Sequence, residues 1–172
     1  VAGKAVEASL QEAGVPMAEK LVIDDPELYA EWRFIEMIED FLKDRDVIAI
    51  AVGSGVINDL TKLVSGRLGR KYMCVGTAVS MDGYTAYGAS ITKDGNKETY
   101  DCPAPYGFVM DPEIAAEAPK ELAASGYADL IAKIPAAADW MLADATGNEK
   151  IDDFSWHLVQ DGLKEALSAP AE

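Results

Sequence analysis

Histidine is almost absent from this sequence of 172 residues, in which His157 is the only one. A metal site built on two histidines and the helical HExxH motif are therefore both excluded within the chain. Cysteine is nearly as scarce, and Cys74 and Cys102 are too few to form a disulfide framework. We therefore expect a protein of the reducing cytoplasm.

Positive charge and long apolar runs are also in short supply. The chain has 15 Lys and Arg against 30 Asp and Glu, a formal net charge of −15. This excludes a broad nucleic-acid or anionic-membrane surface, because such surfaces need clustered cations. The longest apolar stretches, such as residues 47–52, are far too short to span a bilayer, so no membrane insertion is expected. A phosphorylated ligand is still allowed, because the N–H groups at a helix N-terminus bind phosphate whatever the net charge.

The first part of the chain alternates helical and strand patterns. Helices are predicted over residues 2–13, 28–43 and 56–66, and strands over residues 20–23, 47–52 and 71–75. The continuous apolar run at 47–52 is typical of a central parallel strand buried on both faces. The alternation predicts an α/β fold, a Rossmann-like parallel sheet with helices on both faces. Because the chain opens in a helix and without an initiator Met, we expect that a first strand is missing and that the chain is a piece of a longer protein.

The pattern changes after residue 86. Residues 87–92 and 97–101 flank an Asp94-Gly95 pair, which is a strong hairpin signal, and residues 106–110 read as one more strand. Everything after Pro112 has helical composition: residues 112–117, 119–125, 128–144 and 154–167. We place a domain boundary here, with an α/β domain over 1–111 and an incomplete helical domain over 112–172.

Gly53-Ser54-Gly55-Val56-Ile57-Asn58-Asp59 is the first candidate for a functional site. It leaves a predicted buried strand and enters a helix, where glycines allow a ligand close to the backbone and N–H groups bind pyrophosphate. The strict GxGxxG fingerprint is not met, because Asn58 stands where the third glycine belongs. A purely structural turn between strand and helix explains the pattern about equally well.

Gly76-Thr77-Ala78-Val79-Ser80-Met81-Asp82-Gly83 is the second candidate, and it follows the next predicted strand. Open α/β sheets bind ligands at the carboxyl ends of their strands, so both loops are expected at the same edge. The hydroxyls and the carboxylate could line a nucleotide and a sugar-like hydroxyl. They could equally satisfy their own backbone, as polar loop residues often do.

Asp129, in Ser125-Gly126-Tyr127-Ala128-Asp129, is the third candidate. Read as the start of a helix, it could be a metal ligand. The commoner explanation for such spacing is an acidic residue in the first turn, where it is favourable to the helix dipole. Lys133 follows one turn later, and Asp139-Trp140 further along.

Taken in order, these motifs resemble the iron-containing alcohol dehydrogenase and dehydroquinate synthase-like superfamily. Within it, Thr77-Ala-x-Ser80-x-Asp82-Gly, then Gly126-x-x-Asp129 and Asp139-Trp140, are most similar to the bacterial and archaeal glycerol-1-phosphate dehydrogenases. The similarity covers roughly residues 48–142. It implies a nucleotide-binding role for residues 1–111 and a metal-binding role for the domain that begins at 112.

The resemblance also implies residue roles. The residues implied to bind the nucleotide, NAD or NADP, are Gly53, Gly55, Asn58, Asp59, Thr77 and Ser80. Asp82 would contact the substrate and act in catalysis. Asp129 would contact the substrate too, and would be the first of three protein ligands to a divalent metal, zinc or nickel. The implied reaction is hydride transfer from the nucleotide to a small phosphorylated substrate, dihydroxyacetone phosphate, giving glycerol 1-phosphate.

Some features depart from the family pattern. Ala86 replaces a serine that commonly follows the Asp-Gly pair, and His157 lacks the neighbours of the family's histidine ligands. We therefore expect the chain alone to be inactive. A glycerol or other alcohol dehydrogenase remains an alternative, as does a dehydroquinate synthase-like lyase, although the lysine and paired glycines expected of the latter soon after Asp82 are missing. A free-standing nucleotide-binding module would leave a sheet edge exposed. A homodimer is compatible with the sequence.

Overall fold

The computed structural model describes residues 2–168, which form two compact units. The first unit holds the residues up to Val79 together with Gly83–Pro119. The second holds Ser80–Asp82 together with the residues from Lys120 onwards. A tripeptide from the middle of the chain therefore groups with helices that come much later. The roles predicted for residues 1–111 and 112–172 stay predictions.

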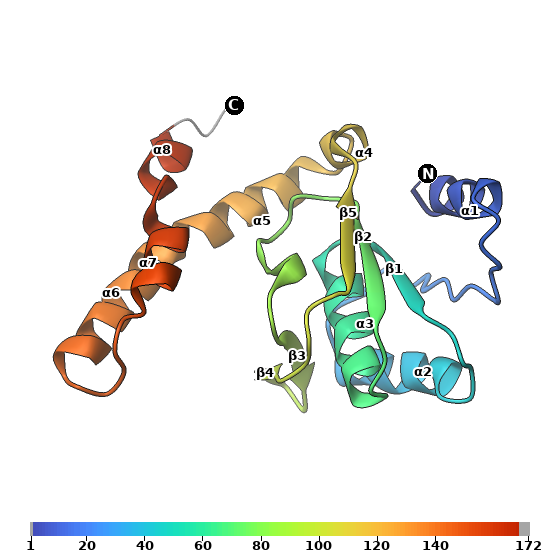
Figure 1. Ribbon diagram of the computed structural model, residues 1–172, viewed down its shortest axis with the longest axis horizontal. Helices are drawn as coiled ribbons and strands as arrows, with labels where there is room; N and C mark the ends of the chain where they lie inside the picture. The colour runs from blue at the N-terminus through green and yellow to red at the C-terminus, as the bar shows by residue number, and fades with distance from the viewer. Residues whose placement is uncertain (1, 169–172) are drawn as a thin grey trace. The chain divides into compact units, whose positions relative to one another are not determined.

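The first unit contains the alternating helices and strands of Figure 1. Its helices are α1 (Ala2–Glu12), α2 (Trp32–Leu42), α3 (Gly55–Arg67), the 3₁₀ turn η1 (Gly83–Thr85) and α4 (Pro112–Ala116). Its strands are β1 (Ala49–Gly53), β2 (Tyr72–Gly76), β3 (Ala89–Lys93), β4 (Asn96–Tyr100) and β5 (Gly107–Met110).

Three of these strands form a parallel sheet in the order β1-β2-β5. Gly53 at the end of β1 pairs with Gly76 at the end of β2, and Gly76 pairs in turn with Met110 of β5. Helix α3 connects β1 to β2 and contacts both strands. The predicted α/β fold is confirmed: a parallel sheet flanked by helices, an antiparallel hairpin, and helices that follow.

β1 does not occupy the central position predicted for residues 47–52. It pairs with β2 alone among the described strands, and Ala51 is the only one of its five residues that is buried. An uninterrupted apolar run fits a strand at the edge of a small sheet as well as a central one, so the pattern could not separate the two. The nucleotide-site hypothesis loses the support of a central strand and rests on the loops themselves.

The strand predicted for residues 20–23 is also wrong. These residues belong to no described strand, and Val22 is 72% exposed. An apolar run becomes a strand only where a neighbour completes its backbone hydrogen bonds. Here the segment links α1 to α2, and two neighbouring ion pairs hold it in its middle: Lys20 with Glu7 at 2.8 Å and Glu19 with Arg45 at 2.7 Å.

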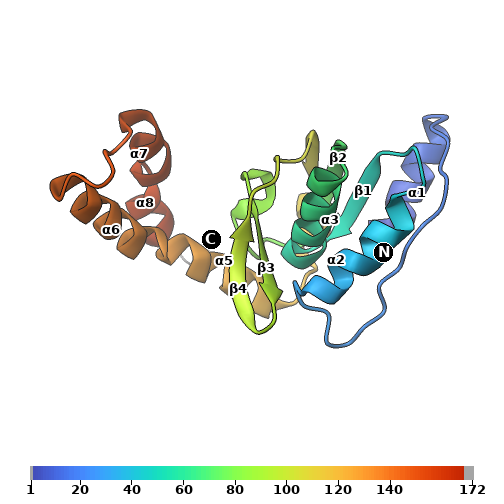
Figure 2. The ribbon, with the colours of Figure 1, turned by 90° about the horizontal axis from the view of Figure 1, so that it is seen from below.

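The apolar core of the first unit lies between α2, α3 and β3, which contact one another (Figure 2). Helix α2 contributes Phe34, Ile35 and Ile38, one face of a helix at three- and four-residue steps. Against them lie residues of α3 and β3, chiefly Leu60, Leu63, Val64 and Ile91. Leu60 and Ile91 are fully buried, which fixes the face of α3 that turns toward the hairpin.

The predicted hairpin is present as β3 and β4, joined by a tight turn. Asp94 and Gly95 have φ angles of 51° and 79°, the left-handed values that a two-residue hairpin turn of this type requires. β3 is half covered by the core while β4 is almost wholly exposed. The Asp-Gly pair therefore predicted the turn, while the two strands begin and end one or two residues away from the predicted bounds.

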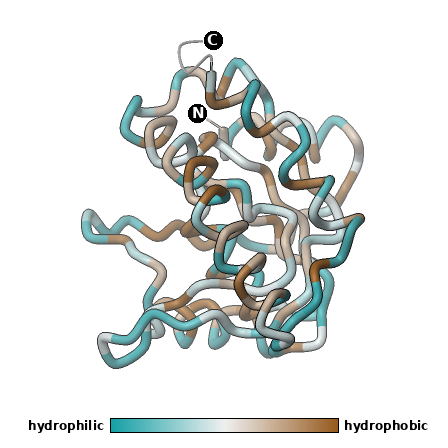
Figure 3. Tube along the Cα trace, turned by 90° about the vertical axis from the view of Figure 1, so that its left-hand side faces the viewer, coloured by the Kyte–Doolittle hydropathy of each residue, from teal (hydrophilic) through white to brown (hydrophobic). Residues whose placement is uncertain are grey.

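The second unit is helical, with α5 (Lys120–Ile131), α6 (Lys133–Ala145), α7 (Asp153–Gln160) and α8 (Leu163–Ser168). α5 and α6 are separated only by Ala132, because Pro135 has no N–H to continue the ladder at Ile131. Gly162, with φ of 82°, separates α7 from α8, which were predicted as one helix. Hydrophobic positions recur along the helices (brown in Figure 3), yet Leu163 is this unit's only buried apolar residue among those described.

No helix formed by residues 2–168 has the length and apolar character that a membrane crossing requires.

Candidate functional site

The glycine turn between β1 and α3 is the first part of the candidate site. Ser54 is the extended N-cap of α3 and makes no side-chain cap hydrogen bond. A Cβ on Gly53 would lie 2.8 Å from the Cβ of Ile57, so a glycine is needed for the turn itself. The structural explanation therefore accounts for Gly53. The turn nonetheless brings the N-terminus of α3 to the carboxyl end of the sheet, where helix N–H groups favour an anion.

The second predicted loop meets the first at this edge. Thr77 follows β2 directly, and its N–H donates to the carbonyl of Gly53 at 3.1 Å. Thr77 is half-buried, and so is Ser80 three residues further on. Both strands thus deliver their loops to one place, as expected of parallel neighbours. The nucleotide-binding roles of Gly53, Gly55, Thr77 and Ser80 stay predictions.

Asn58 is fully buried, and its side chain is used inside the protein. Its Nδ2 donates to the carbonyl of Tyr84 at 3.3 Å, and its Oδ1 accepts from the Tyr72 hydroxyl at 3.0 Å. Burial raises the pKa of Tyr72, which keeps this hydroxyl protonated and able to donate. The Asn58 side chain therefore supports the loop after β2, and a nucleotide contact at this position would fall to its backbone.

Asp59 lies beside Asn58 on the first turns of α3, with its side chain 15% exposed. Burial raises the pKa of its carboxyl, while the nearby Lys62 and a hydrogen bond from the backbone of Ser90 act in the opposite direction. Its Oδ1 is 3.7 Å from the Lys62 Nζ, an ion pair without a hydrogen bond. A carboxyl of this kind, partly desolvated at a loop edge, is suited to accept a hydrogen bond from a ligand.

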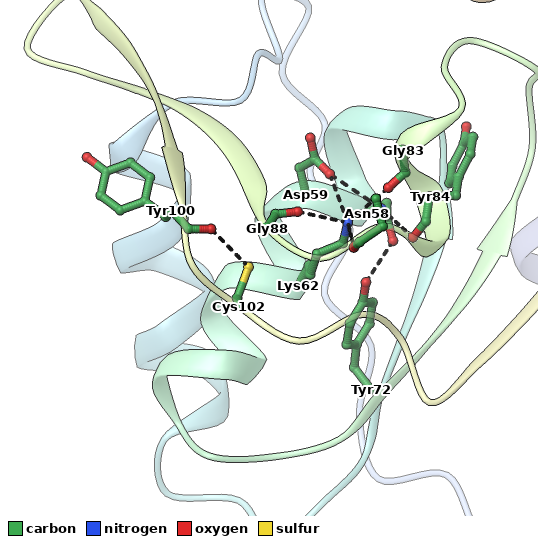
Figure 4. A network of polar contacts seen from close by, with 10 residues as sticks. Asn58, Asp59, Lys62, Tyr72, Gly83, Tyr84, Gly88, Tyr100 and Cys102 are labelled. Carbon is green, nitrogen blue, oxygen red and sulfur yellow. Dashed lines mark hydrogen bonds and ion pairs between the residues drawn. The ribbon is translucent and has the colours of Figure 1, made fainter. Parts of the chain in front are cut away.

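Lys62 is a residue that the sequence analysis missed. Its side chain is fully buried, and its Nζ donates to three backbone carbonyls, those of Gly83, Ala86 and Gly88, at 3.0, 3.0 and 3.1 Å. Figure 4 shows the Lys62 side chain beside Gly83 and Gly88, with Asn58 and Asp59 close by. A lysine one turn after Asn58, on a helix that otherwise buries Leu60, Leu63 and Val64, was the available signal.

Asp82 and Asp129 come together in the second unit. The N–H of Asp82 donates to Oδ2 of Asp129 at 3.0 Å, and Lys133 Nζ lies 2.8 Å from Oδ2 of Asp82. Partial burial opposes ionisation of Asp82, but the hydrogen bonds with Lys133 and Asp129 and the charge of Lys133 lower its pKa. Two carboxylates and one ammonium thus form a compact polar cluster with Asp82 half exposed.

Asp129 does not occupy the helix start predicted for it. It lies in the last turn of α5, whose first turn holds Glu121 instead. A carboxylate is unfavourable at the negative end of the helix dipole, so the first-turn explanation of Asp129 is wrong. One helix was predicted to end at residue 125 and another to begin at residue 128, whereas α5 runs through both positions.

His157 lies away from this cluster in α7, exposed and 3.3 Å from Asp161. Among residues 2–168 no group of three His, Cys, Asp or Glu side chains could hold a metal ion. Asp129 is a suitable single ligand, because Lys133 engages Asp82 and not Asp129. Its role in metal binding stays a prediction.

Residues 1–119 match the family of iron-containing alcohol dehydrogenases. The chain belongs to this family. It is also 30% identical over 170 residues to a glycerol-1-phosphate dehydrogenase [NAD(P)+] of Bacillus velezensis, covering 96% of the chain and 43% of that protein. The protein of the same name from the archaeon Haloarcula marismortui is 30% identical over 161 residues, covering 93% and 44%. The chain thus spans less than half the length of these relatives.

Solved structures share the fold of this family member at low sequence identity. Maleylacetate reductase from Agrobacterium tumefaciens is similar with a TM-score of 0.63 and 15% identity, over 99% of this chain and 49% of that one. A probable glycerol dehydrogenase from Sinorhizobium meliloti has a TM-score of 0.56 and 23% identity, over 60% and 30%. A 2-deoxy-scyllo-inosose synthase, solved with carbaglucose-6-phosphate, NAD+ and Co2+, has a TM-score of 0.62 and 18% identity, over 76% and 38%.

Proposed function

We propose that this chain forms part of an NAD(P)-dependent, metal-assisted dehydrogenase that reduces dihydroxyacetone phosphate to glycerol 1-phosphate. The observation that carries the proposal is the similarity to relatives named glycerol-1-phosphate dehydrogenase [NAD(P)+], from both bacteria and archaea, over almost the whole chain. Membership of the iron-containing alcohol dehydrogenase family gives the coarser class of enzyme. The substrate is what we propose in addition.

The glycine turn and the loop after β2 would hold the nucleotide. The turn offers the N-terminus of α3 to the pyrophosphate, and Thr77 joins the two loops through its bond to Gly53. Ser80 would add a hydroxyl contact to the nucleotide, and Asp59 a carboxylate contact. When bound, NADH or NADPH would supply the hydride, and the chain's own residues would orient it.

Asp82 and Asp129 would bind the substrate, and Asp129 would also bind the metal. Asp129 would provide one of three ligands to zinc or nickel, which would polarise the substrate carbonyl when bound. Asp82 would accept a hydrogen bond from a neighbouring hydroxyl, since its half-exposed carboxylate is held ionised by Lys133. Residues 2–168 contain no group of three His, Cys, Asp or Glu side chains that could complete such a metal site.

The test is a comparison of Asp129→Asn with Asp153→Asn in the full-length protein to which we propose this chain belongs. We expect Asp129→Asn to lose bound zinc or nickel and at least about a hundred-fold in reduction of dihydroxyacetone phosphate, with NADH binding retained. The control Asp153→Asn, an exposed aspartate of α7, should keep both.

A variant Asp129→Asn that kept its metal and its turnover would contradict the metal assignment. Reduction of dihydroxyacetone phosphate should be compared with oxidation of glycerol and of simple alcohols under the same conditions. Preference for glycerol or another unphosphorylated alcohol would replace the proposed substrate while leaving the family unchanged. Turnover without net oxidation of NADH would point to lyase chemistry instead.

A further inference from the structure

Lys62 is an unusual residue because it is charged, fully buried and not paired by hydrogen bond to any carboxylate among the described residues. Its relative exposure is 1%, and its nearest carboxylate oxygen, in Asp59, lies 3.7 Å away. Taking an ammonium out of water is costly unless its donors are satisfied. The three carbonyls at 3.0–3.1 Å satisfy all three of them.

These carbonyls belong to a single short stretch of chain, Gly83 to Gly88, which returns from the second loop toward β3. The stretch contains η1, and Asn58 of α3 also bonds to it, through the carbonyl of Tyr84. At the opposite end of the loop, Thr77 is bonded to Gly53. Residues 77–88 are therefore held at both ends, and three of the bonds at the far end come from Lys62. Figure 4 shows the Lys62 side chain beside Gly83 and Gly88.

An ammonium is better suited than a neutral side chain to bind these three carbonyls at once. Carbonyls that turn toward one point carry partial negative charge, and a lysine offers them three donors and a full positive charge at the end of a flexible stem. A neutral amide offers only two donors. Gly88 permits the arrangement, because its φ is 84° and a Cβ there would lie 3.1 Å from the Thr99 side chain.

We propose that Lys62 is a positioning residue that sets the place of the loop of residues 77–88 by binding the carbonyls of Gly83, Ala86 and Gly88. It acts on the loop through the backbone, as a bound cation would, and its ion pair with Asp59 at 3.7 Å is not what holds the loop. The inference goes beyond the proposed function and does not depend on it, since it concerns the order of the loop whether or not a nucleotide binds.

Hydrogen exchange of the 172-residue chain tests this directly. In Lys62→Met, amides of residues 83–88 should exchange at least about ten-fold faster, while those of α2 and β1 keep their rates. Lys71→Met, the same change at an exposed lysine of the first unit, should alter neither. Asp59→Asn should also leave the loop protected. Unchanged exchange in the loop, or loss of protection in Asp59→Asn equal to that in Lys62→Met, would overturn the proposal.

A second measurement needs no variant and applies even if Lys62→Met does not fold. In a nitrogen-15 NMR spectrum near neutral pH, exposed lysine ammonium groups vanish through rapid exchange with water, but that of Lys62 should be visible. It should also show scalar couplings across its hydrogen bonds to the carbonyl carbons of Gly83, Ala86 and Gly88. A missing ammonium signal, or a signal without these couplings, would show that Lys62 does not hold the loop.

Discussion

Asp59 is the residue whose titration should be most visible in the stability of the first unit. Burial raises the pKa of its carboxyl above the ordinary 3.8. The folded state therefore holds this proton more tightly than the unfolded chain, and the resulting stabilisation is complete below pH 3.8 and is lost as the pH rises through the folded-state pKa. Asp59→Asn cannot ionise. Its free energy of unfolding, relative to that of the unmodified chain, should rise with pH across this window and then level off.

The measurement is urea unfolding between about pH 3 and pH 7, followed by Trp32 fluorescence with Trp140 and Trp156 replaced by Phe. Asp46→Asn, at an exposed carboxylate of the same unit, controls for the loss of one negative charge. A difference between Asp59→Asn and the unmodified chain that stays constant with pH would show that burial does not govern this carboxyl.

Individual residues were predictable from the sequence only where their chemistry is local. The glycine turn and the Asp94-Gly95 pair were found because their backbone geometry depends on neighbours in the chain. Lys62 was missed because its partners lie more than 20 positions away, at Gly83, Ala86 and Gly88. Asp129 was assigned to the wrong end of its helix. Only the family resemblance, which gives Asp82 and Asp129 the same substrate, indicated that the two residues lie close together.

Helix α5 allows a test at the level of a single element, because it carries one acid near each end. Glu121 lies in its first turn, where the helix dipole favours a negative charge, and Asp129 in its last, where the dipole opposes it. We expect Asp129→Asn to stabilise the second unit by about 0.3–1 kcal/mol and Glu121→Gln to destabilise it by a similar amount. The amide introduced by Asp129→Asn retains an oxygen that can accept from the N–H of Asp82.

Urea unfolding followed by Trp140 and Trp156 fluorescence, with Trp32 replaced by Phe, measures both changes. If Asp129→Asn destabilised the unit as much as Glu121→Gln does, the Asp129 charge would have to be holding the Asp82 segment in place. The expected result would instead mark Asp129 as a carboxylate kept at some cost to its own helix, as functional residues often are.

Helices and strands were predicted well where a periodic apolar pattern extends over many residues. They were predicted poorly where the neighbouring strand decides whether and where a segment pairs. The face of α2 that carries Phe34, Ile35 and Ile38 followed from its period alone. Residues 20–23 and β1 have strand composition, but pairing depends on which strand lies alongside, and composition does not record that. The parallel sheet itself followed from the alternation of helices and strands.

At the scale of the whole molecule, the two units differ sharply in how much apolar surface they bury. The first has a continuous core built on α2, α3 and β3, whereas Phe154 and Leu158 of the second are 76% and 72% exposed. Because burial of apolar surface is the main source of stability, the second unit should unfold at a lower urea concentration than the first.

The tryptophans report separately on the unfolding of the two units. Trp32 belongs to the first unit, whereas Trp140 and Trp156, whose ring centroids are 6.1 Å apart, belong to the second. Two chains, one retaining Trp32 alone and the other retaining Trp140 and Trp156, should give transitions that do not coincide. Coincident transitions would mean that the chain unfolds as one cooperative body despite the small core of its second unit.

The bond between Asp82 and Asp129 spans 47 positions, which matters for the order in which the molecule is made. A ribosome adding residues at about 5–20 per second needs roughly 2–9 s to pass from the first of these residues to the second. The Lys62 ammonium can meet its last carbonyl, at Gly88, after only 26 positions. During synthesis, residues 83–88 can therefore bond to Lys62 of α3 before Asp129 of α5, the partner of Asp82, has been added to the chain.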